Sequence, residues 1–484
     1  MQMRRLILLW LALVLCLGLV ACGGGGTPEE GAGDAAATEP AAEEPAAEEP
    51  AAEEPAAEEP TAEPAAEEPT AEPAAEEPTA EAAGEGETAG DATGTIRVSS
   101  VAGAMHDVLV GLAEAYMAEN PGVTVTVEDE PEGGIFQALI AAGNQPDLVV
   151  TSLGPALGQL AADDALVPLE EFEGFQELID RVDPGIVEQF SGHNYYVPIG
   201  ADVTMMIYNK DLFEQAGLDP ESPPQTWAEY LDAARAIDEL GGDIYGNVFW
   251  NEALAWGGWY WNMLQPIYLN SNQGQCQLVN RLGSDIVFDD PECGMQQFFE
   301  FTQQAQQYAP LTMETNFFSR KIGMWPQYGY SWEPNLETAA DQPMVIGEDV
   351  GVAPVPVPNE GDTSFTTYGG RALIIMKTTP DRQAAAWDLL QFMMEEENNR
   401  QFITELGYLP TLLSLREDPY FQEPARQPFV DILENGMLPQ QFSTAETVAN
   451  EVQAVYQQAV VEGELTPDEA VTQSAERARA ALAQ

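Results

Sequence analysis

The stretch from Gly23 to Gly94 divides this chain into a part that cannot build a hydrophobic core and a part that can. The unit AAEEP occurs four times from Ala41 to Pro60, and TAEPAAEEP then occurs twice up to Pro78. Alanine and glutamate favour a helix, but a proline every four or five residues breaks each turn before it propagates. The stretch has no aromatic residue, so we expect an extended, self-repelling spacer that holds a folded body away from a membrane.

Residues 1–21 have the layout of a secretion signal. Arg4 and Arg5 precede an apolar run to about Val20, which is too short to span a bilayer comfortably. The run ends in LVAC, with Cys22 followed at once by glycines. This pattern resembles the lipobox of bacterial lipoproteins, and the resemblance implies cleavage before Cys22 and attachment of a lipid to its sulfur. The alternatives are an ordinary signal peptide and an anchor helix.

The chain is strongly acidic, with a formal net charge of −64 at pH 7. Residues 23–94 contain 22 acidic residues and no basic one, so about −44 remains once the spacer and the two arginines of the signal are removed. The folded part is therefore acidic itself. Nucleic acid, anionic lipid and polyphosphate are poor partners for such a surface, whereas neutral and cationic ligands stay possible. A saline habitat and genomic composition would both account for the acidity.

Residues 95–484 are enough for two domains, each with its own core. A β-branched run, an amphipathic helical pattern, an alternating strand, a second helical pattern and an apolar strand follow one another over 94–154. This order is typical of an open α/β sheet with a largely parallel core. Ligands bind such sheets outside the carboxyl ends of the strands, which makes the loops that carry Met105 and Ser152 and the region of Asp202 candidate ligand contacts.

The most specific pattern covers residues 195–237, which read YYVPIGADVTMMIYNKDLFEQAGLDPESPPQTWAEYLDAARAI. This stretch resembles bacterial extracellular solute-binding proteins of the maltose-binding type, in which a strand leads to YNKDLF, an AGLD turn and a helix that TWAEY opens. Thr226 is suited to cap this helix, whose first turn carries Glu229, and Gly217 suits a left-handed helix end. The likeness runs from about Thr95 to the C-terminus and is weakest over 242–310.

The resemblance implies a two-lobed clamshell of the type II-like periplasmic-binding-protein fold, each lobe an open, mainly parallel sheet flanked by helices. The lobes are expected to combine 95–203 with 370–410, and 204–369 with 411–484. It further implies an exported, monomeric receptor of an ABC importer, anchored to the outer face of the cell membrane by its lipid. The receptor would capture a sugar or oligosaccharide between the lobes, close on it and deliver it to membrane permease subunits, without catalysis or a cofactor.

Sugar recognition combines aromatic rings, against which apolar sugar faces are buried, with carboxylates and amides that bond the hydroxyls. Asp202 aligns with an acidic residue that bonds sugar hydroxyls in the family, although a surface aspartate at a strand edge is an alternative. Gly370 would let the backbone approach a ligand and Arg371 would donate to it, unless the glycine pair 369–370 serves only as a hinge. The candidate ligand-binding residues are Asp202, Trp250, Glu252, Trp256, Tyr330, Trp332, Gly370, Arg371, Ser152 and Met105.

Residues 249–264 read FWNEALAWGGWYWNML, which is both rich in aromatic rings and spaced like a helix after its first third. We expect the FWNE loop, with Trp250 and Glu252, to face the ligand. Trp259 and Trp261 are expected in the core behind it, and Trp325 is also expected in a core.

Cys276 and Cys293 remain in the folded part, and two cysteines in an exported protein predict a disulfide rather than a metal pair. Unpaired buried thiols are the alternative. Two histidines, His106 and His193, are too few and too dispersed to predict a metal site, and no nucleotide loop or nucleophile elbow occurs. Other functions stay open: the same fold with a polyamine, peptide or other cationic solute, or a surface module that binds polysaccharide without a transporter.

Overall fold

The computed structural model describes residues 94–130, 135–154, 156–248, 259–311, 317–329, 336 and 343–483. Glu85–Gln484 form one compact unit. The signal, Cys22 and nearly all of the spacer lie outside the described residues. None of the described helices is both long and apolar enough to cross a membrane.

One half of this unit, the first lobe, is built on a sheet with the strand order β2-β1-β3-β8-β4. β1 (Gly94–Ser100) runs parallel to β2 (Val123–Asp129) and to β3 (Leu148–Ser152). β8 (Thr366–Ile375) is antiparallel to both β3 and β4 (Tyr196–Asn209). β4 therefore runs in the same direction as the first three strands, and only β8 is reversed.

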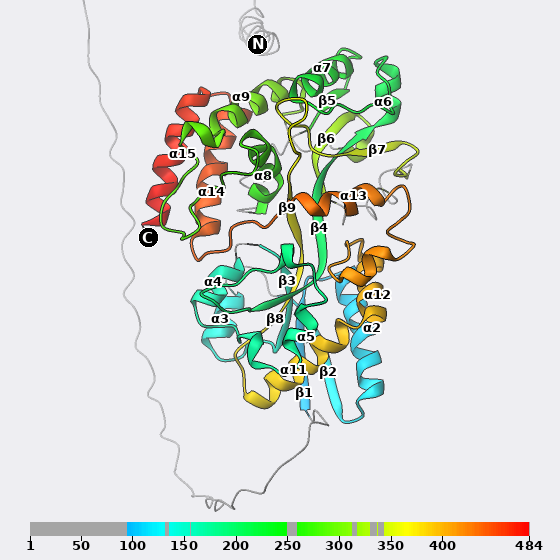
Figure 1. Ribbon diagram of the computed structural model, residues 1–484, viewed down its shortest axis with the longest axis vertical. Coiled ribbons are helices and arrows are strands. Elements are labelled where there is room, and N and C mark those ends of the chain that lie inside the picture. The colour runs from blue at the N-terminus through cyan, green and yellow to red at the C-terminus, as the bar shows by residue number, and fades with distance from the viewer. Residues whose placement is uncertain are drawn as a thin grey trace, which may run out of the picture. The chain divides into compact units, whose positions relative to one another are not determined.

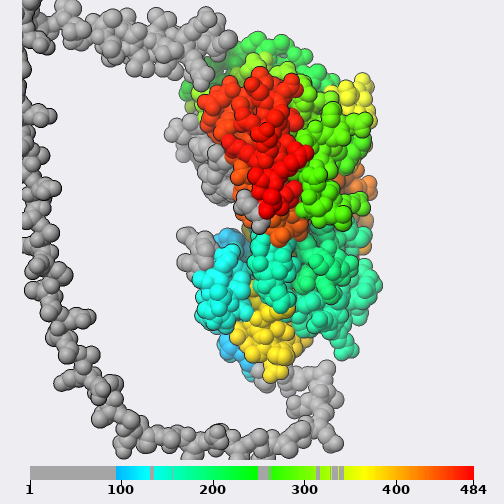
Figure 2. Space-filling view, turned by 90° about the vertical axis from the view of Figure 1, so that its left-hand side faces the viewer, coloured from blue at the N-terminus to red at the C-terminus, as the bar shows by residue number. Residues whose placement is uncertain are grey.

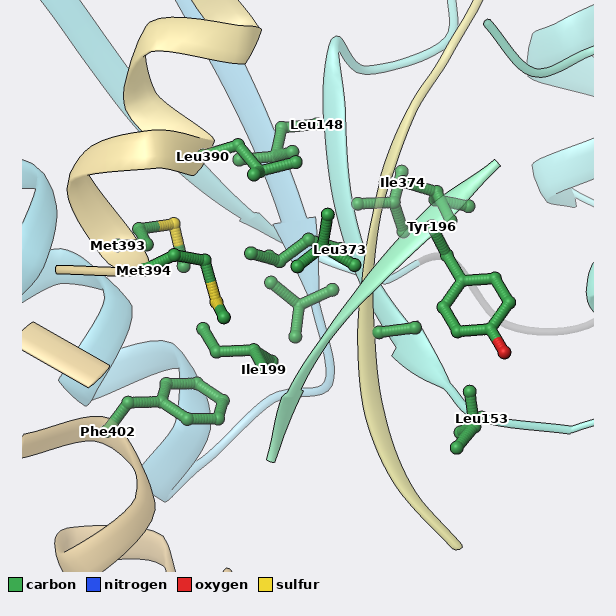
Figure 3. Packing of buried hydrophobic residues seen from close by; sticks show 14 of the residues in the cluster. Leu148, Leu153, Tyr196, Ile199, Leu373, Ile374, Leu390, Met393, Met394 and Phe402 are labelled. Atoms are coloured by element: carbon green, nitrogen blue, oxygen red, sulfur yellow. The ribbon is translucent and has the colours of Figure 1, made fainter. Parts of the chain in front are cut away.

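The helices of the first lobe cover this sheet in the lower half of Figure 1. Their apolar side chains pack on the strands, as Figure 3 shows for Met393 and Phe402 beside Ile199 and Leu373, all of which are almost fully buried. The strand–helix order expected over 94–154 is confirmed. The helices are α2 (Ala104–Glu119), α3 (Ile135–Ala141), α4 (Ala156–Ala162), α5 (Phe175–Ile179), α11 (Pro380–Met393) and α12 (Glu396–Leu406).

The second lobe continues from the far end of β4. β6 (Ile322–Gly329) and β7 (Val350–Ala353) both pair antiparallel with β4, and β5 (Tyr245–Asn247) runs parallel to β6. Its helices are α6 (Lys210–Gln215), α7 (Trp227–Asp238), α8 (Trp259–Ser271), α9 (Met295–Ala305), α14 (Ala445–Tyr456) and α15 (Pro467–Leu482).

Shorter elements connect the two lobes and close their loops. α13 (Gln427–Asp431) and β9 (Gly436–Met437) lie near the middle of the molecule, where β9 pairs with the start of β8 (Figure 1). The remaining turns are η1 (Leu169–Glu171), η2 (Pro184–Ile186), η4 (Pro291–Cys293), η5 (Gln306–Tyr308), η6 (Phe317–Ser319), η8 (Leu413–Glu417), η9 (Ile432–Asn435) and the π-turn η10 (Gln457–Val461).

Each lobe has its own large apolar core, and the chain passes between the cores within β4. Met205 belongs to the core of the first lobe and Met206 to that of the second. The first core also takes in residues from 368 to 433, and the second resumes at Val448. Figure 2 shows the surface indented where the lobes meet. The division of the chain into lobes at 203/204, 369/370 and 410/411 stays a proposal.

Several local predictions are confirmed. Thr226 caps α7 in a capping box with Glu229, each side chain bonding the backbone of the other residue. Gly217 follows α6 with φ of 74°, the left-handed conformation that favours glycine. Cys276 and Cys293 form a disulfide with 5.4 Å between their Cα atoms. Trp261 and Trp325 are core residues, 5% and 3% exposed, as expected.

Candidate functional site

The strongest candidate site lies where β4 and β8 cross from one lobe to the other. On this antiparallel pair Asp202 is opposite Gly369, and Gly200 is opposite Arg371. Arg371 is also opposite Ser152, the last residue of β3. Directly opposed residues share a face of the sheet, and alternate residues of one strand share it too. Three of the predicted site residues, Asp202, Arg371 and Ser152, are therefore brought to one face.

Arg371 is held by two hydroxyl groups from distant parts of the chain. Its Nε donates to Tyr408 Oη at 3.0 Å, and its Nη1 donates to Ser152 Oγ at 2.8 Å. The Tyr408 side chain lies over Gly200, where an added Cβ would be 2.8 Å from the Tyr408 Cβ. Tyr408 also stacks on Phe402. The guanidinium is thus fixed in direction while it stays partly exposed.

Asp202 occupies a space that neighbouring glycines leave open. A Cβ added to Gly329 of β6 would be 2.8 Å from one Asp202 carboxylate oxygen, and one added to Gly369 would contact the Asp202 Cβ at 3.6 Å. The Asp202 Oδ1 accepts from the Val203 backbone N–H at 2.9 Å. The carboxylate therefore lies at the junction of β4, β6 and β8, where the strands of both lobes meet.

Gly370 is required by backbone packing. It has φ of 113°, and a Cβ at this position would be 2.1 Å from the carbonyl oxygen of Gly200. No larger residue fits unless β4 and β8 separate. Backbone packing alone therefore accounts for a glycine at this position, and a ligand contact for Gly370 stays a prediction.

Further ionisable groups follow the ends of β1 and β2. His106 Nδ1 is 2.8 Å from an Asp129 carboxylate oxygen. Glu130, the next residue, is near Arg371: partial loss of hydration raises the pKa of the Glu130 carboxyl, and the positive charge of Arg371 partly lowers it. The Glu130 side chain as a whole is exposed. The carboxyl ends of these strands thus carry polar groups, of which Glu130 is near Arg371.

A second polar cluster anchors the start of β8, from which the strand runs into the first lobe. Tyr368 Oη donates to the Leu433 carbonyl at 2.5 Å and lies 3.4 Å from Asp183 Oδ2, and Arg416 forms an ion pair with the same Asp183 carboxylate. Burial raises the pKa of the Tyr368 hydroxyl, and the charge of Asp183 raises it further. The hydroxyl therefore stays protonated. This cluster ties β8 to η2, η8 and η9 through Asp183, Arg416 and the Leu433 carbonyl.

The other predicted site residues have different outcomes. Met105 is 6% exposed in the apolar core of the first lobe, where it packs rather than faces solvent; a ligand contact for it stays a prediction. Trp250, Glu252, Trp256, Tyr330 and Trp332 lie outside the described residues, as does the Trp259 side chain.

Tyr408 is the clearest residue that sequence reasoning missed. The sequence predicts a boundary between the lobes at 410/411, just after Tyr408, but no pattern there indicates that the Tyr408 hydroxyl bonds Arg371. The available signal was its place two residues before Pro410 at this boundary, beside a strand with an arginine.

Other surfaces are weaker candidates. A groove of about 360 Å³ is lined by Leu231, Arg235 and Tyr308 on α7 and η5, away from the crossing, and Arg235 there is paired with Asp232. In the part of the chain that the structure describes, no three His, Cys, Asp or Glu side chains gather as metal ligands would. The crossing therefore remains the best-supported site.

Comparison with known proteins agrees with this architecture. Residues 102–400 match the family model of the bacterial extracellular solute-binding proteins, and the chain belongs to this family. It is 26% identical over 333 residues to the maltotriose-binding protein of Pyrococcus abyssi, a match that covers 64% of this chain and 65% of that relative, slightly less than two thirds. It is 25% identical over 382 residues to the sn-glycerol-3-phosphate-binding periplasmic protein UgpB of Pectobacterium atrosepticum, covering 71% and 80% of the two chains.

Among solved structures, the chain resembles the cyclic alpha-maltosyl-1,6-maltose binding protein from Arthrobacter globiformis. The TM-score is 0.69 at 23% identity, and the match covers 81% of this chain and 99% of that one. A likeness at this identity shows the fold. The two-lobed α/β fold class predicted from the sequence is confirmed.

Proposed function

We propose that this chain is the receptor of an ABC importer and captures a sugar or oligosaccharide between its two lobes. The observation that carries the proposal is the convergence of Asp202, Arg371 and Ser152 on one sheet face at the crossing of β4 and β8. A carboxylate accepts hydrogen bonds from sugar hydroxyls, and the guanidinium and the serine hydroxyl donate to sugar oxygens. The relative named for maltotriose supports this ligand class.

The proposal includes export, anchoring and movement. Lipid on Cys22 would hold the chain at the outer face of the cell membrane, and the Ala/Glu/Pro spacer would let the body reach the permease. Trp250, Glu252, Trp256, Tyr330 and Trp332 would supply rings and a further carboxylate to the ligand. β4 and β8 pass through both lobes, so rotation about them would close the lobes on the ligand without disrupting either core.

A cationic solute is the second candidate, because the body of the chain is acidic and Asp202 lies at the crossing. Arg371 argues against it, since a guanidinium on the same face as Asp202 repels a cation. A binding panel separates the two candidates directly.

The test is a thermal-shift screen of the full chain with mono- and oligosaccharides, polyamines, amino acids and peptides. A ligand at 100 times its dissociation constant stabilises the folded state by roughly 2.7 kcal/mol. We expect a shift with a sugar that is lost in Asp202→Asn. Asp180→Asn, which changes an exposed carboxylate bonded to Gln176, is the matched control. A shift with polyamines alone would replace the sugar by a cation, and a shift with no member of the panel would reject the proposal.

Closure and transport have their own readouts. We expect the radius of gyration from small-angle scattering to decrease when the sugar identified in the screen is added. Labelled palmitate would be incorporated into the wild-type chain and not into Cys22→Ser.

A further inference from the structure

Arg371, Ser152 and Tyr408 together form a group of hydrogen-bond donors at the crossing; below they are called the donor group. Both hydroxyl oxygens accept from the Arg371 guanidinium, so the hydrogen of each hydroxyl is directed elsewhere. Within the described ranges, neither hydroxyl donates to a protein acceptor. A guanidinium has five N–H groups, and the described residues engage two of those of Arg371. The donor group therefore offers several hydrogens and needs an acceptor-rich partner.

Arg371 is also unusual among the basic residues of this acidic body. Most of them form ion pairs; among the residues that the structure describes, only Arg181, Arg281 and Arg371 have no carboxylate oxygen within 4.0 Å. Arg181 and Arg281 are exposed, so water solvates them, whereas Arg371 is partly buried. Glu130 is close enough to interact with Arg371 through charge but makes no ion pair with it. Nothing in this part of the chain neutralises Arg371 by direct contact.

Asp202 lies on the same face as the donor group, two residues along β4 from Gly200, the residue opposite Arg371. The two ends of the face thus differ: one accepts hydrogen bonds from hydroxyls, and the other donates to oxygens. A neutral sugar can donate its hydroxyl hydrogens to Asp202, but it offers only uncharged oxygens to the donor group. An anionic group at the second end would gain charge-assisted hydrogen bonds, which are about twice as strong as neutral ones.

We infer that the donor group binds the anionic group of an acidic sugar or polyol, a carboxylate or a phosphate, while Asp202 accepts from hydroxyls of the same molecule. This inference rests on the proposed function, which places the ligand at the crossing, and it names the class of sugar. Of the two anions, a carboxylate matches the planar fork of the guanidinium and carries one charge into an acidic protein, whereas a phosphate carries up to two.

The test measures dissociation constants of the full chain by calorimetry with matched pairs of probes. The pairs are galacturonate with galactose, glucuronate with glucose, the trisaccharide of each acid with the trisaccharide of its neutral sugar, and glycerol 3-phosphate with glycerol. We expect the acidic member of one pair to bind at least about tenfold more tightly than its neutral partner. The uronate and phosphate arms separate the two anions, and either one supports the inference. We further expect the preference to weaken as salt is raised, because charge is screened.

Variants then locate the preference. Arg371→Gln should abolish the advantage of the acidic probe, and Arg371→Lys, which keeps the charge without the fork, should retain part of it. Ser152→Ala and Tyr408→Phe should each reduce it several-fold. Arg281→Gln removes the same charge from an exposed loop and should leave the preference intact. The unfolding midpoint of each variant without ligand shows whether it folds, and Arg371→Lys remains informative if Arg371→Gln does not.

The outcomes separate this inference from the function on which it rests. Equal binding of acidic and neutral sugars, or a preference that survives in folded Arg371→Gln, would overturn the inference and leave the sugar receptor standing. Binding of no probe in any pair, together with a silent sugar screen, would overturn both.

Discussion

Two arginines of the first lobe, Arg382 and Arg371, illustrate the difference between holding a fold together and preparing a site. Arg382 pairs with Asp147, whose side chain is fully buried and which also accepts from the Arg97 backbone N–H at 2.9 Å. Among the described residues, the hydroxyls of Ser152 and Tyr408 are the hydrogen-bond partners of the Arg371 guanidinium. In this part of the chain, one guanidinium is neutralised by a carboxylate and the other is not.

The contrast indicates how to separate stability from binding in this protein. The Asp147 group joins β1, the start of β3 and α11, so it stabilises the sheet on which the site depends. The donor group places a positively charged guanidinium of fixed orientation at the crossing, without a carboxylate partner among the described residues. We therefore expect changes at Asp147 to lower stability and changes at Arg371 to lower affinity.

A large effect on stability, similar in size to that of removing the disulfide, is expected from Asp147→Asn. The substitution leaves Arg382 without its counter-charge, and loss of one partner of a buried pair costs about 3–5 kcal/mol. The Arg382 side chain is 37% exposed, so water compensates in part and we expect about 2–3 kcal/mol. Urea unfolding measures this change. Arg371→Gln should lower the free energy of unfolding by less than about 1 kcal/mol, and equal losses in the two variants would end the contrast.

The disulfide lies in the second lobe and extends the comparison to a covalent constraint. Cys276 and Cys293 are 17 residues apart, and the chain-entropy model gives about 3 kcal/mol for a loop of this size. We expect the double variant Cys276→Ser and Cys293→Ser to unfold at correspondingly lower denaturant while its sugar affinity is unchanged. A large loss of affinity in the folded double variant would mean that this loop acts on the site.

A smaller effect is expected at the start of α7. Thr226→Ala removes the side chain that caps the helix, and such changes typically cost about 1 kcal/mol. Thr226→Ser keeps the hydroxyl and serves as the control. Thermal unfolding of the two variants measures the difference, and no difference between them would show that the capping hydroxyl contributes nothing.

The smallest effect concerns acid pH. The hydrogen bond from Arg400 lowers the pKa of the Asp418 carboxyl below 3.8, although burial opposes this shift. Because the folded pKa is the lower one, this pair stabilises the fold above the unfolded pKa of Asp418, and the contribution is lost as the pH falls through the folded pKa. Wild type should therefore exceed Asp418→Asn in stability at pH 6, and the gap should narrow below pH 3.8. A gap that is constant with pH would exclude this linkage.

Local sequence patterns predicted much of the fold but less of the site. The strands and helices of 94–152, the cap at Thr226 and the turn at Gly217 depend on residues close in sequence, so they could be inferred from spacing and residue type. The bond from Arg371 to Ser152 joins residues 219 positions apart, and no local pattern encodes it. The same holds for Tyr408.

Met105 shows how the start of a helix can bury a residue that lies near the end of a strand. It follows β1 in sequence, where loops often meet ligands, but α2 begins at Ala104 and turns the side chain into the apolar core. Burying a large apolar side chain stabilises the folded state by about 1.5–3 kcal/mol, which accounts for this orientation. Burial explains the position of Met105 without a ligand, and a ligand contact for it stays a prediction.

The central claim is that the face carrying Asp202, Gly369 and Arg371 is where the ligand binds. Hydrogen exchange of the full chain, with and without a saturating amount of the sugar that gives the largest thermal shift, tests it most directly. We predict that backbone amides of 200–203 and 369–371 exchange more slowly with the sugar, while those of the groove on α7 are unchanged. Protection on α7, with none at the crossing, would contradict the account.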